Sequence, residues 1–214
     1  MFRKYFIILT VYLIGLASLA IIVAWIFDIT VVLSILPGFI TIKFSTALAF
    51  FLSSLILYFA YYSPQGRFAN LNLIIVSFSI LIIWIMMITI LVSIIFGFKS
   101  GIENLFIIDT TIATNPYVPG RPSLGTIVAF LLITILGLNI FYEGKWKNQL
   151  FLFLGSLVFL IGAVSKIGLI LAVPVLYYDV PSISNAISIP ASILFMFIGL
   201  AFSLLYKINP KRQA

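Results

Sequence analysis

The sequence predicts an all-α integral membrane protein, and three observations lead to that prediction. Hydrophobic residues make up 64% of the 214 positions and charged residues only 8%, whereas a soluble domain is about a quarter charged. The mean hydropathy is +1.30. The apolar residues are gathered into long runs, and a helix needs about 20 of them to cross the hydrocarbon layer. A water-soluble fold of this length has no interior large enough for so much apolar surface.

Six apolar runs are expected to form transmembrane helices within a single domain, residues 1–214. In chain order the runs cover residues 5–27, 44–62, 71–96, 123–142, 150–172 and 187–206. The first run follows a basic start, as a signal peptide does, but its apolar stretch is too long for a signal. An even number of crossings places both termini on the same side of the bilayer.

The distribution of Lys and Arg predicts which side that is. Eight of these residues lie at the termini or in the even-numbered loops: Arg3, Lys4, Arg67, Lys145, Lys147, Lys207, Lys211 and Arg212. The odd-numbered loops hold three, namely Lys43, Lys99 and Arg121. Because short cytoplasmic loops carry the excess of positive charge, both termini are expected in the cytoplasm. The predicted location is the plasma or inner membrane, with the lipid bilayer as the first partner.

The composition disfavours most catalytic chemistry. The chain has no cysteine and no histidine, so thiolate sites, disulfides and the commonest metal ligand and general base are missing. We expect no enzyme activity, no cofactor and no metal site. The net charge of +7 does not indicate nucleic-acid binding, because the basic residues are scattered singly or in pairs between apolar runs.

An internal repeat is the most informative feature of the chain. Residues 46–52 read TALAFFL, residues 126–132 read TIVAFLL, and a weaker copy at residues 191–197 reads ASILFMF. Each follows a loop rich in Pro, Gly or Ser. The pattern predicts three successive helix-loop-helix units, over about residues 5–62, 71–142 and 150–206.

The repeat places small residues on either side of a phenylalanine on one helix face. Positions four apart share a face, which gives the triplets Thr46/Phe50/Ser54, Thr126/Phe130/Thr134 and Ala191/Phe195/Gly199. Small residues let membrane helices approach closely, so these faces are expected to pack together at the centre of the bundle. A ligand-lined cavity is the alternative interpretation, and packing is the commoner case.

Charged residues supply two further candidates. Lys99, Glu103, Asp109 and Arg121 are expected to form a polar cluster in the outer loops, which orders the long loop or binds a polar ligand. Exposed ion pairs are common and weak, which favours the structural role. Lys166 is an intramembrane charge and therefore a functional candidate by default. It lies near the outer end of its helix, so we expect its side chain to reach the interface instead.

The chain reads FGFKSGIENLF at residues 96–106, ATNPY at 113–117 and PGRPS at 119–123, followed by Thr126 and the AFLL of residues 129–132. These segments resemble the membrane-embedded N-terminal region of multidomain, PAS-type sensor histidine kinases and diguanylate cyclases. The first and third repeats carry weaker matches. Glu103 replaces the usual Asp of this family, Pro122 replaces Met and Leu124 replaces Pro.

The resemblance implies a non-catalytic sensory or ligand-binding module for signal transduction. In that family the last helix leads into cytoplasmic output domains, whereas this sequence ends at Ala214. Action through a separate protein partner is therefore expected, with an apolar small molecule as one kind of stimulus. Two alternatives stay open: an accessory or structural subunit of a larger membrane complex, and the substrate-binding component of a small-molecule transporter. Broken helices or paired intramembrane charges would favour transport.

Overall fold

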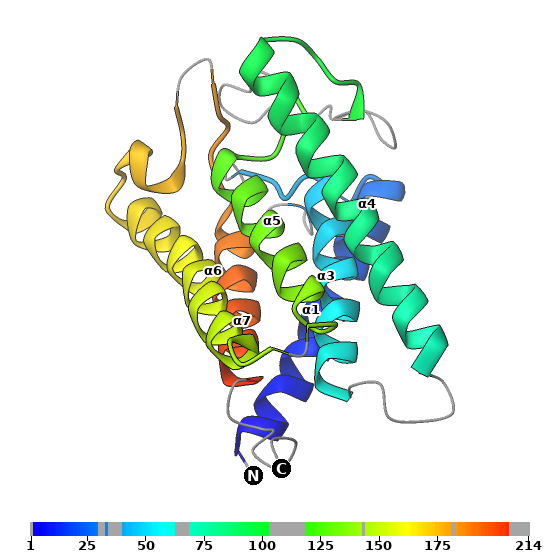
Figure 1. Ribbon diagram of the computed structural model, residues 1–214. Helices are drawn as coiled ribbons and strands as arrows, with labels where there is room; N and C mark the ends of the chain where they lie inside the picture. The colour runs from blue at the N-terminus through cyan, green and yellow to red at the C-terminus, as the bar shows by residue number, and fades with distance from the viewer. Residues whose placement is uncertain are drawn as a thin grey trace.

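The computed structural model describes residues 2–29, 33, 40–62, 69–102, 119–142, 144–180 and 183–205. Those residues form a bundle of α-helices, with one short 3-10 helix and no named strand among them (Figure 1). In chain order the elements are α1 (Phe2–Ile26), α3 (Phe44–Tyr62), α4 (Ala69–Phe96), α5 (Leu124–Leu138), α6 (Lys147–Ile170), η2 (Pro174–Tyr177) and α7 (Ile189–Leu205). The all-α prediction is therefore confirmed.

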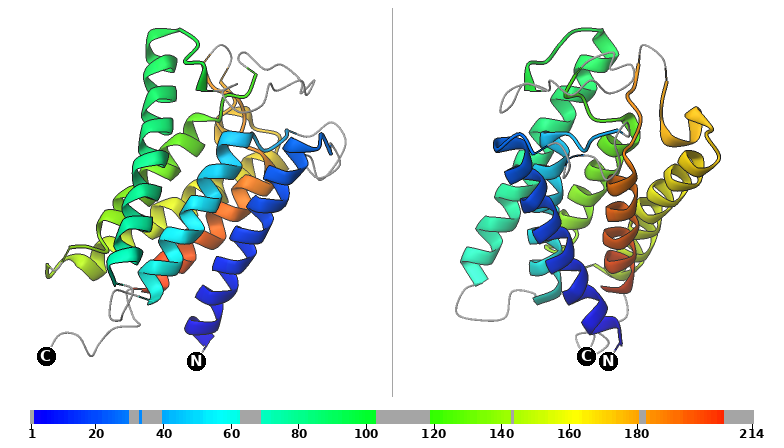
Figure 2. Two further views of the ribbon diagram at one scale, coloured as in Figure 1. Left: turned by 90° about the vertical axis from the view of Figure 1, so that its right-hand side faces the viewer. Right: turned by 180° about the vertical axis from the view of Figure 1, so that it is seen from behind.

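Successive helices run in alternating directions, so α3, α5 and α7 all begin at the same end of the bundle (Figures 1 and 2). The start of α1 and the end of α7 lie together at the opposite end. At the end where α3, α5 and α7 begin, α4 continues past all three (Figure 2). Their first turns are therefore set back from that end of the molecule.

Four helices are long and apolar enough to cross a membrane: α1, α3, α4 and α6. α5 has 15 residues and α7 has 17. At about 1.5 Å per residue these two helices are about 22–26 Å long, less than the roughly 30 Å of a hydrocarbon core. The outward face of α4 carries large exposed apolar side chains such as Ile74, Phe78 and Ile85. Such a face suits contact with lipid.

The observed helix ends differ from the predicted spans. α5 ends at Leu138, not near residue 142, because the next residues form tight turns in which Ile140 N donates to Gly137 O at 3.1 Å. The side chain of Asn139 then bonds Lys147 O at 2.8 Å and closes the turn into α6. That helix begins at Lys147, three residues before the predicted start of its apolar run. Hydropathy marks apolar runs and says little about where helical hydrogen bonding stops.

Three phenylalanines from the repeated segments meet in the core. Phe50 of α3, Phe130 of α5 and Phe195 of α7 are fully buried, and their ring centroids lie 4.6–5.0 Å apart. Two of the three pairs have the edge-to-face geometry that aromatic rings prefer. This phenylalanine cluster joins the three helices nearly two turns below their starts.

Glycines hold α6 and α7 in close contact. A Cβ added at Gly199 would lie 2.4 Å from Phe159 N, and one added at Gly162 would lie 2.5 Å from Ser192 O. Both distances are too short for any side chain. Small residues therefore let the two backbones approach, as in other membrane helix pairs, and α7 is firmly attached to α6.

Candidate functional site

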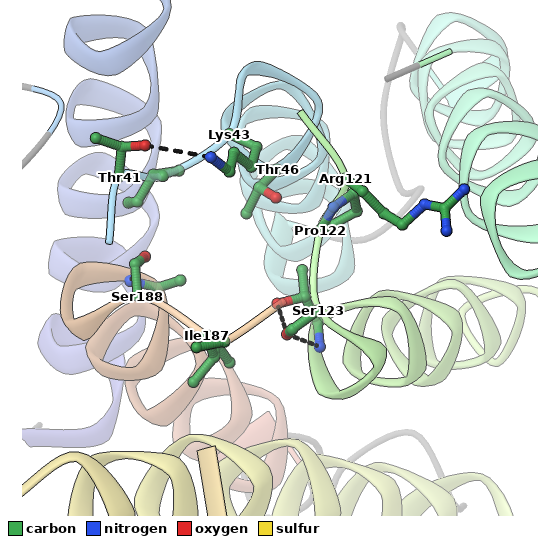
Figure 3. A pocket seen from close by; sticks show the side chains of 12 residues that line it. Thr41, Lys43, Thr46, Arg121, Pro122, Ser123, Ile187 and Ser188 are labelled. Carbon is green, nitrogen blue, oxygen red and sulfur yellow. Dashed lines mark hydrogen bonds between the residues drawn. The ribbon is translucent and has the colours of Figure 1, made fainter. Parts of the chain in front are cut away.

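A small polar recess lies where α3, α5 and α7 begin (Figure 3). Each helix contributes the three residues before its first turn, which we name the lead-in segment, and the third residue of the helix. The twelve lining residues are Thr41, Ile42, Lys43 and Thr46; Arg121, Pro122, Ser123 and Thr126; and Ala186, Ile187, Ser188 and Ala191. Each helix therefore contributes the same four positions to the lining, counted from its start.

The recess is narrow. Its free interior volume is about 10 Å³, which is room for about one water molecule. A whole small-molecule ligand does not fit inside the recess. A single oxygen-sized atom does.

Neighbouring side chains bond two of the first backbone N–H groups of α5. Ser123 is the N-cap residue: its Oγ accepts from Thr126 N at 3.1 Å and lies 2.8 Å from the Thr126 hydroxyl. The backbone N–H of Leu124 donates to Ser184 Oγ at 2.9 Å. Because the first N–H groups of a helix have no partner within the helix, such side-chain acceptors stabilise its start.

Arg121 lies in the lead-in of α5, but its guanidinium points away from the recess (Figure 3). It donates to Phe98 O at 2.9 Å and to Ser93 Oγ at 3.2 Å, at the end of α4. A cation near a helix C-terminus is stabilised by the partial negative charge there. Arg121 therefore ties the start of α5 to the end of α4.

The segment that leads into α7 is held against the lead-in of α5 and against η2. Asn185 Nδ2 donates to Arg121 O at 2.8 Å, and Ile187 N donates to Tyr177 O at 2.9 Å. Ser188 occupies the N-cap position, and its Oγ accepts from Ala191 N at 3.4 Å. Two of the three helices at the recess thus have a serine cap.

The lead-in of α3 is built differently, with Lys43 at the N-cap position. Its ammonium donates to Thr41 Oγ1 at 3.4 Å, and the Lys43 side chain is 6% exposed. Trp25, at the end of α1, fixes this segment by donating from its indole to Ile42 O at 2.8 Å. A lysine side chain has no acceptor and cannot cap a helix N-terminus.

The first turn of α3 consequently has several polar groups without a partner. Among the described residues, neither the backbone N–H nor the hydroxyl of Ser45 or Thr46 makes a hydrogen bond. Both side chains are 3% exposed, and Thr46 projects from α3 into the recess (Figure 3). The equivalent hydroxyl of α5, that of Thr126, is paired with Ser123. Buried polar groups are nearly always paired, so we expect a hydrogen-bond acceptor to bind at this turn.

Three helix N-termini converge on the recess, each with a partial positive charge, and Lys43 belongs to its lining. None of the twelve lining residues is acidic. Over the described part of the chain, no group of three or more potential metal-ligating side chains comes together either.

The residues predicted as a stripe divide into two groups. Thr46 and Thr126 line the recess, and Phe50 and Phe130 lie in the buried phenylalanine cluster. The hydroxyls of Ser54 and Thr134 bond backbone carbonyls of their own helices, at 2.7 Å in each case. Only the upper end of the stripe therefore borders free space.

The other predicted site residues do not gather at the recess. Of the outer-loop cluster, Lys99 is exposed, Arg121 contacts α4 as described, and Glu103 and Asp109 lie outside the described residues. Lys166 is half-buried in the last part of α6, four residues before its end, and does not line the recess.

Sequence reasoning missed Lys43, Ser123 and Ser188 as site residues. The signal that would have found them is their position directly before each repeated segment, where a helix cap is expected. When the alignment of the three repeated segments is extended backwards by three residues, Lys43, Ser123 and Ser188 occupy the same position.

Comparisons with protein-family models, with curated proteins and with solved structures gave no match for this chain. The resemblance to the input regions of sensor kinases and cyclases therefore stays a prediction from the sequence.

Proposed function

We propose that this protein is a non-catalytic sensory or ligand-binding module of a cell membrane, acting through a separate protein partner. One observation carries the proposal: the polar recess between α3, α5 and α7 is lined by Thr46, whose hydroxyl makes no hydrogen bond among the described residues, and the adjacent buried hydroxyl of Ser45, outside the lining, is unpaired as well. A purely structural junction of three helices would be expected to satisfy those groups itself, as the start of α5 does.

In this proposal the chain crosses the membrane six times, with both termini in the cytoplasm. The four long apolar helices support a membrane location. The charge distribution of the sequence supports the orientation, because eight basic residues belong to the termini and even-numbered loops, and the four of them within the described residues, Arg3, Lys4, Lys145 and Lys147, lie at the end opposite the recess. The recess then faces the outer side. The shorter α5 and α7 begin below the end of α4, so it lies at the level of the lipid headgroups.

α7 provides a route from the recess to the cytoplasmic end. Ser188 and Ala191 line the recess, Phe195 follows one turn later in the phenylalanine cluster, and the helix then continues to Leu205. A change in how the recess packs would be passed to α7 and, through the close glycine contact, to α6. We propose that a protein partner reads this change.

The chemistry of the recess supports a binding role in preference to a catalytic one. Its side chains offer hydroxyls and one ammonium, and the chain contains no histidine or cysteine. General acid–base catalysis requires groups that exchange protons near the working pH, and serine and threonine hydroxyls do not.

The test is purification from native membranes through a C-terminal affinity tag in a mild detergent, followed by mass spectrometry of proteins and small molecules. The wild type is compared with Thr46→Val in the recess and with Thr134→Val, which makes the same change two turns deeper in a neighbouring helix. We expect a bound molecule in the wild type and in Thr134→Val, and its loss from Thr46→Val.

Two outcomes would overturn the proposal in favour of its alternatives. A set of membrane subunits at fixed stoichiometry, with no small molecule bound, would make the protein an accessory subunit. Co-purification with a coupling ATPase would make it the substrate-binding component of a transporter, an alternative that the set-back helix starts also fit.

A further inference from the structure

We propose that the turn between α6 and η2 is inserted among the lipid acyl chains of the leaflet at the recess end of the bundle. Residues 170–175, which we name the apolar tip, read ILAVPV, and all six are exposed. The inference goes beyond the proposed function, because it assigns a lipid-binding surface outside the recess. It uses only the membrane placement of the helices.

Composition distinguishes the apolar tip from other exposed turns. The side chains of Ile170 and Val175 are each 73% exposed. Residues 167–178 contain no charge, whereas the exposed runs at the ends of α1 and α4 include Asp28 and Lys99 respectively. Exposed apolar surface of this kind marks contact with a membrane or with another protein.

The backbone of the segment favours hydrocarbon over water. α6 ends in a Schellman motif, in which Val173 N donates to Gly168 O at 2.9 Å. Three more N–H groups donate to carbonyls of the same segment at 3.0–3.2 Å, those of Leu176, Tyr178 and Asp179. In water, exposed N–H groups can bond solvent, whereas in hydrocarbon the chain must satisfy them itself. This internally bonded turn therefore meets the requirement for insertion into lipid.

The apolar tip continues an exposed apolar stripe of α6. Leu160, Val164 and Ile167 are exposed at a spacing of about one turn, and Leu171 follows in the tip. The turn lies at the edge of the bundle on the side away from α4, at the level where α5 begins (Figures 1 and 2). That is the headgroup level proposed above, from which apolar side chains insert about 5–10 Å toward the acyl chains.

The residues on either side of the tip suit the headgroup layer. Lys166, the one charged residue in the last three turns of α6, is half-buried, and its long side chain can reach that layer. Tyr177 and Tyr178 follow the tip and precede Asp179. Tyrosine is enriched at membrane interfaces, so this pair suits the point where the chain leaves the acyl chains.

Insertion of the tip also fixes the depth of the recess. Tyr177 O accepts from Ile187 N, in the lead-in of α7, at 2.9 Å. The ring of Tyr178 lies against Gly125, in the first turn of α5. The lipid-bound turn is therefore attached to the starts of two of the three helices that form the recess.

The test uses single cysteines, since the chain contains none of its own. Val175→Cys and Ile170→Cys probe the tip. Lys99→Cys, at an exposed position after α4, is the control in water, and Leu160→Cys, exposed midway along α6, is the control in lipid. Each full-length variant reacts with a charged maleimide, first in native membranes and then as one copy per phosphatidylcholine nanodisc, where both membrane faces are open.

The two tip variants are expected to react at least about tenfold more slowly than Lys99→Cys, and about as slowly as Leu160→Cys, because the reactive thiolate is disfavoured in apolar surroundings. All four variants should react fully after unfolding in SDS. Bimane attached at position 175 is expected to be quenched by phosphatidylcholine brominated on its acyl chains, and not by iodide in the water.

Reaction of both tip variants as fast as Lys99→Cys in nanodiscs, with quenching by iodide, would place the tip in water and overturn the inference. Slow reaction in native membranes but fast reaction in single-copy nanodiscs would show that a second copy or another protein covers the tip, which also overturns it. Neither result depends on what the recess binds, so a failure here leaves the proposed function standing.

Discussion

The first turns of α5 and α3 occupy equivalent places around the recess, yet neighbouring side chains bond the N–H groups of the first and not of the second. At α5, Ser123 caps the helix, Ser184 accepts from Leu124 N, and Arg121 ties the segment to α4. At α3, Lys43 replaces the serine, and the polar groups of Ser45 and Thr46 have no partner among the described residues. The α5 start is therefore a structural junction, and the α3 start has the open binding capacity.

Tyr178 extends the contrast, because its ring covers the first turn of α5. A Cβ added at Gly125 would lie 2.4 Å from two atoms of that ring. Tyr178 itself has a positive φ of 61° and follows η2 in the connection from α6 to α7. The first turn of α5 is thus covered by the connection between α6 and α7. If the contrast is real, variants at the α5 start change stability, and variants at the α3 start change binding.

The largest expected effect is that of Arg121→Met. This change removes a charged donor from Phe98 O and Ser93 Oγ and the cation from the end of α4. We expect the free energy of unfolding to fall by about 3 kcal/mol, measured by unfolding in mixed maltoside and SDS micelles. Lys99→Met, which removes an exposed cation, is the control. Equal losses for the two variants would show that the Arg121 contacts do not hold the α5 start.

Gly125→Ala is expected to cost about 2 kcal/mol, because the new methyl group meets the Tyr178 ring. In a Tyr178→Ala background the same change should cost much less, since the obstructing ring is gone. The two changes thus form a double-mutant cycle in the same unfolding experiment. Additive losses would contradict the contact.

The two N-cap positions allow a direct comparison. Ser123→Ala is expected to lower the free energy of unfolding by about 1 kcal/mol, the usual value of a serine cap. At position 43, Ser is expected to be more stable than Ala by about the same amount, since only Ser can cap α3. Equal stabilities of Lys43→Ser and Lys43→Ala would indicate that the first turn of α3 needs no acceptor.

The smallest effect concerns pH. Burial raises the pKa of Tyr178 above its ordinary value of about 10. The unfolded chain therefore loses this phenol proton first, so the contribution of Tyr178 to stability is fully present below about pH 10 and declines as the pH rises further. The difference in unfolding free energy between the wild type and Tyr178→Phe should change above pH 10 and stay constant below pH 9. A constant difference throughout would place Tyr178 in water.

The sequence was sufficient for the fold class and for the central contact, and insufficient for the recess. Composition predicted an all-α membrane protein, and a four-residue spacing singled out Phe50 and Phe130, whose rings do meet. The helix ends of α5 were missed because turn geometry at Asn139, not hydropathy, sets them. Lys43 was counted only as a loop charge, since one residue does not reveal that two other helices begin beside it.

The different roles of Lys43 and Arg121 could not be predicted from the sequence either. Both are basic residues of the odd-numbered loops, and both are almost fully buried. Their roles depend on which helix end lies within reach: Arg121 reaches the C-terminus of α4, whereas Lys43 stays at the N-terminus of its own helix. That distinction requires the arrangement of helices in space.

The most direct test of the account compares the amide chemical shifts of the ¹⁵N-labelled protein in maltoside micelles before and after removal of the small molecule that co-purifies from native membranes. The account predicts that removal shifts the Ser45 and Thr46 amides, whose N–H groups are unpaired among the described residues. The Leu124 and Thr126 amides, already bonded to Ser184 and Ser123, should stay in place. Small parallel shifts at both helix starts, or none at either, would contradict the claim that the first turn of α3 is the binding site.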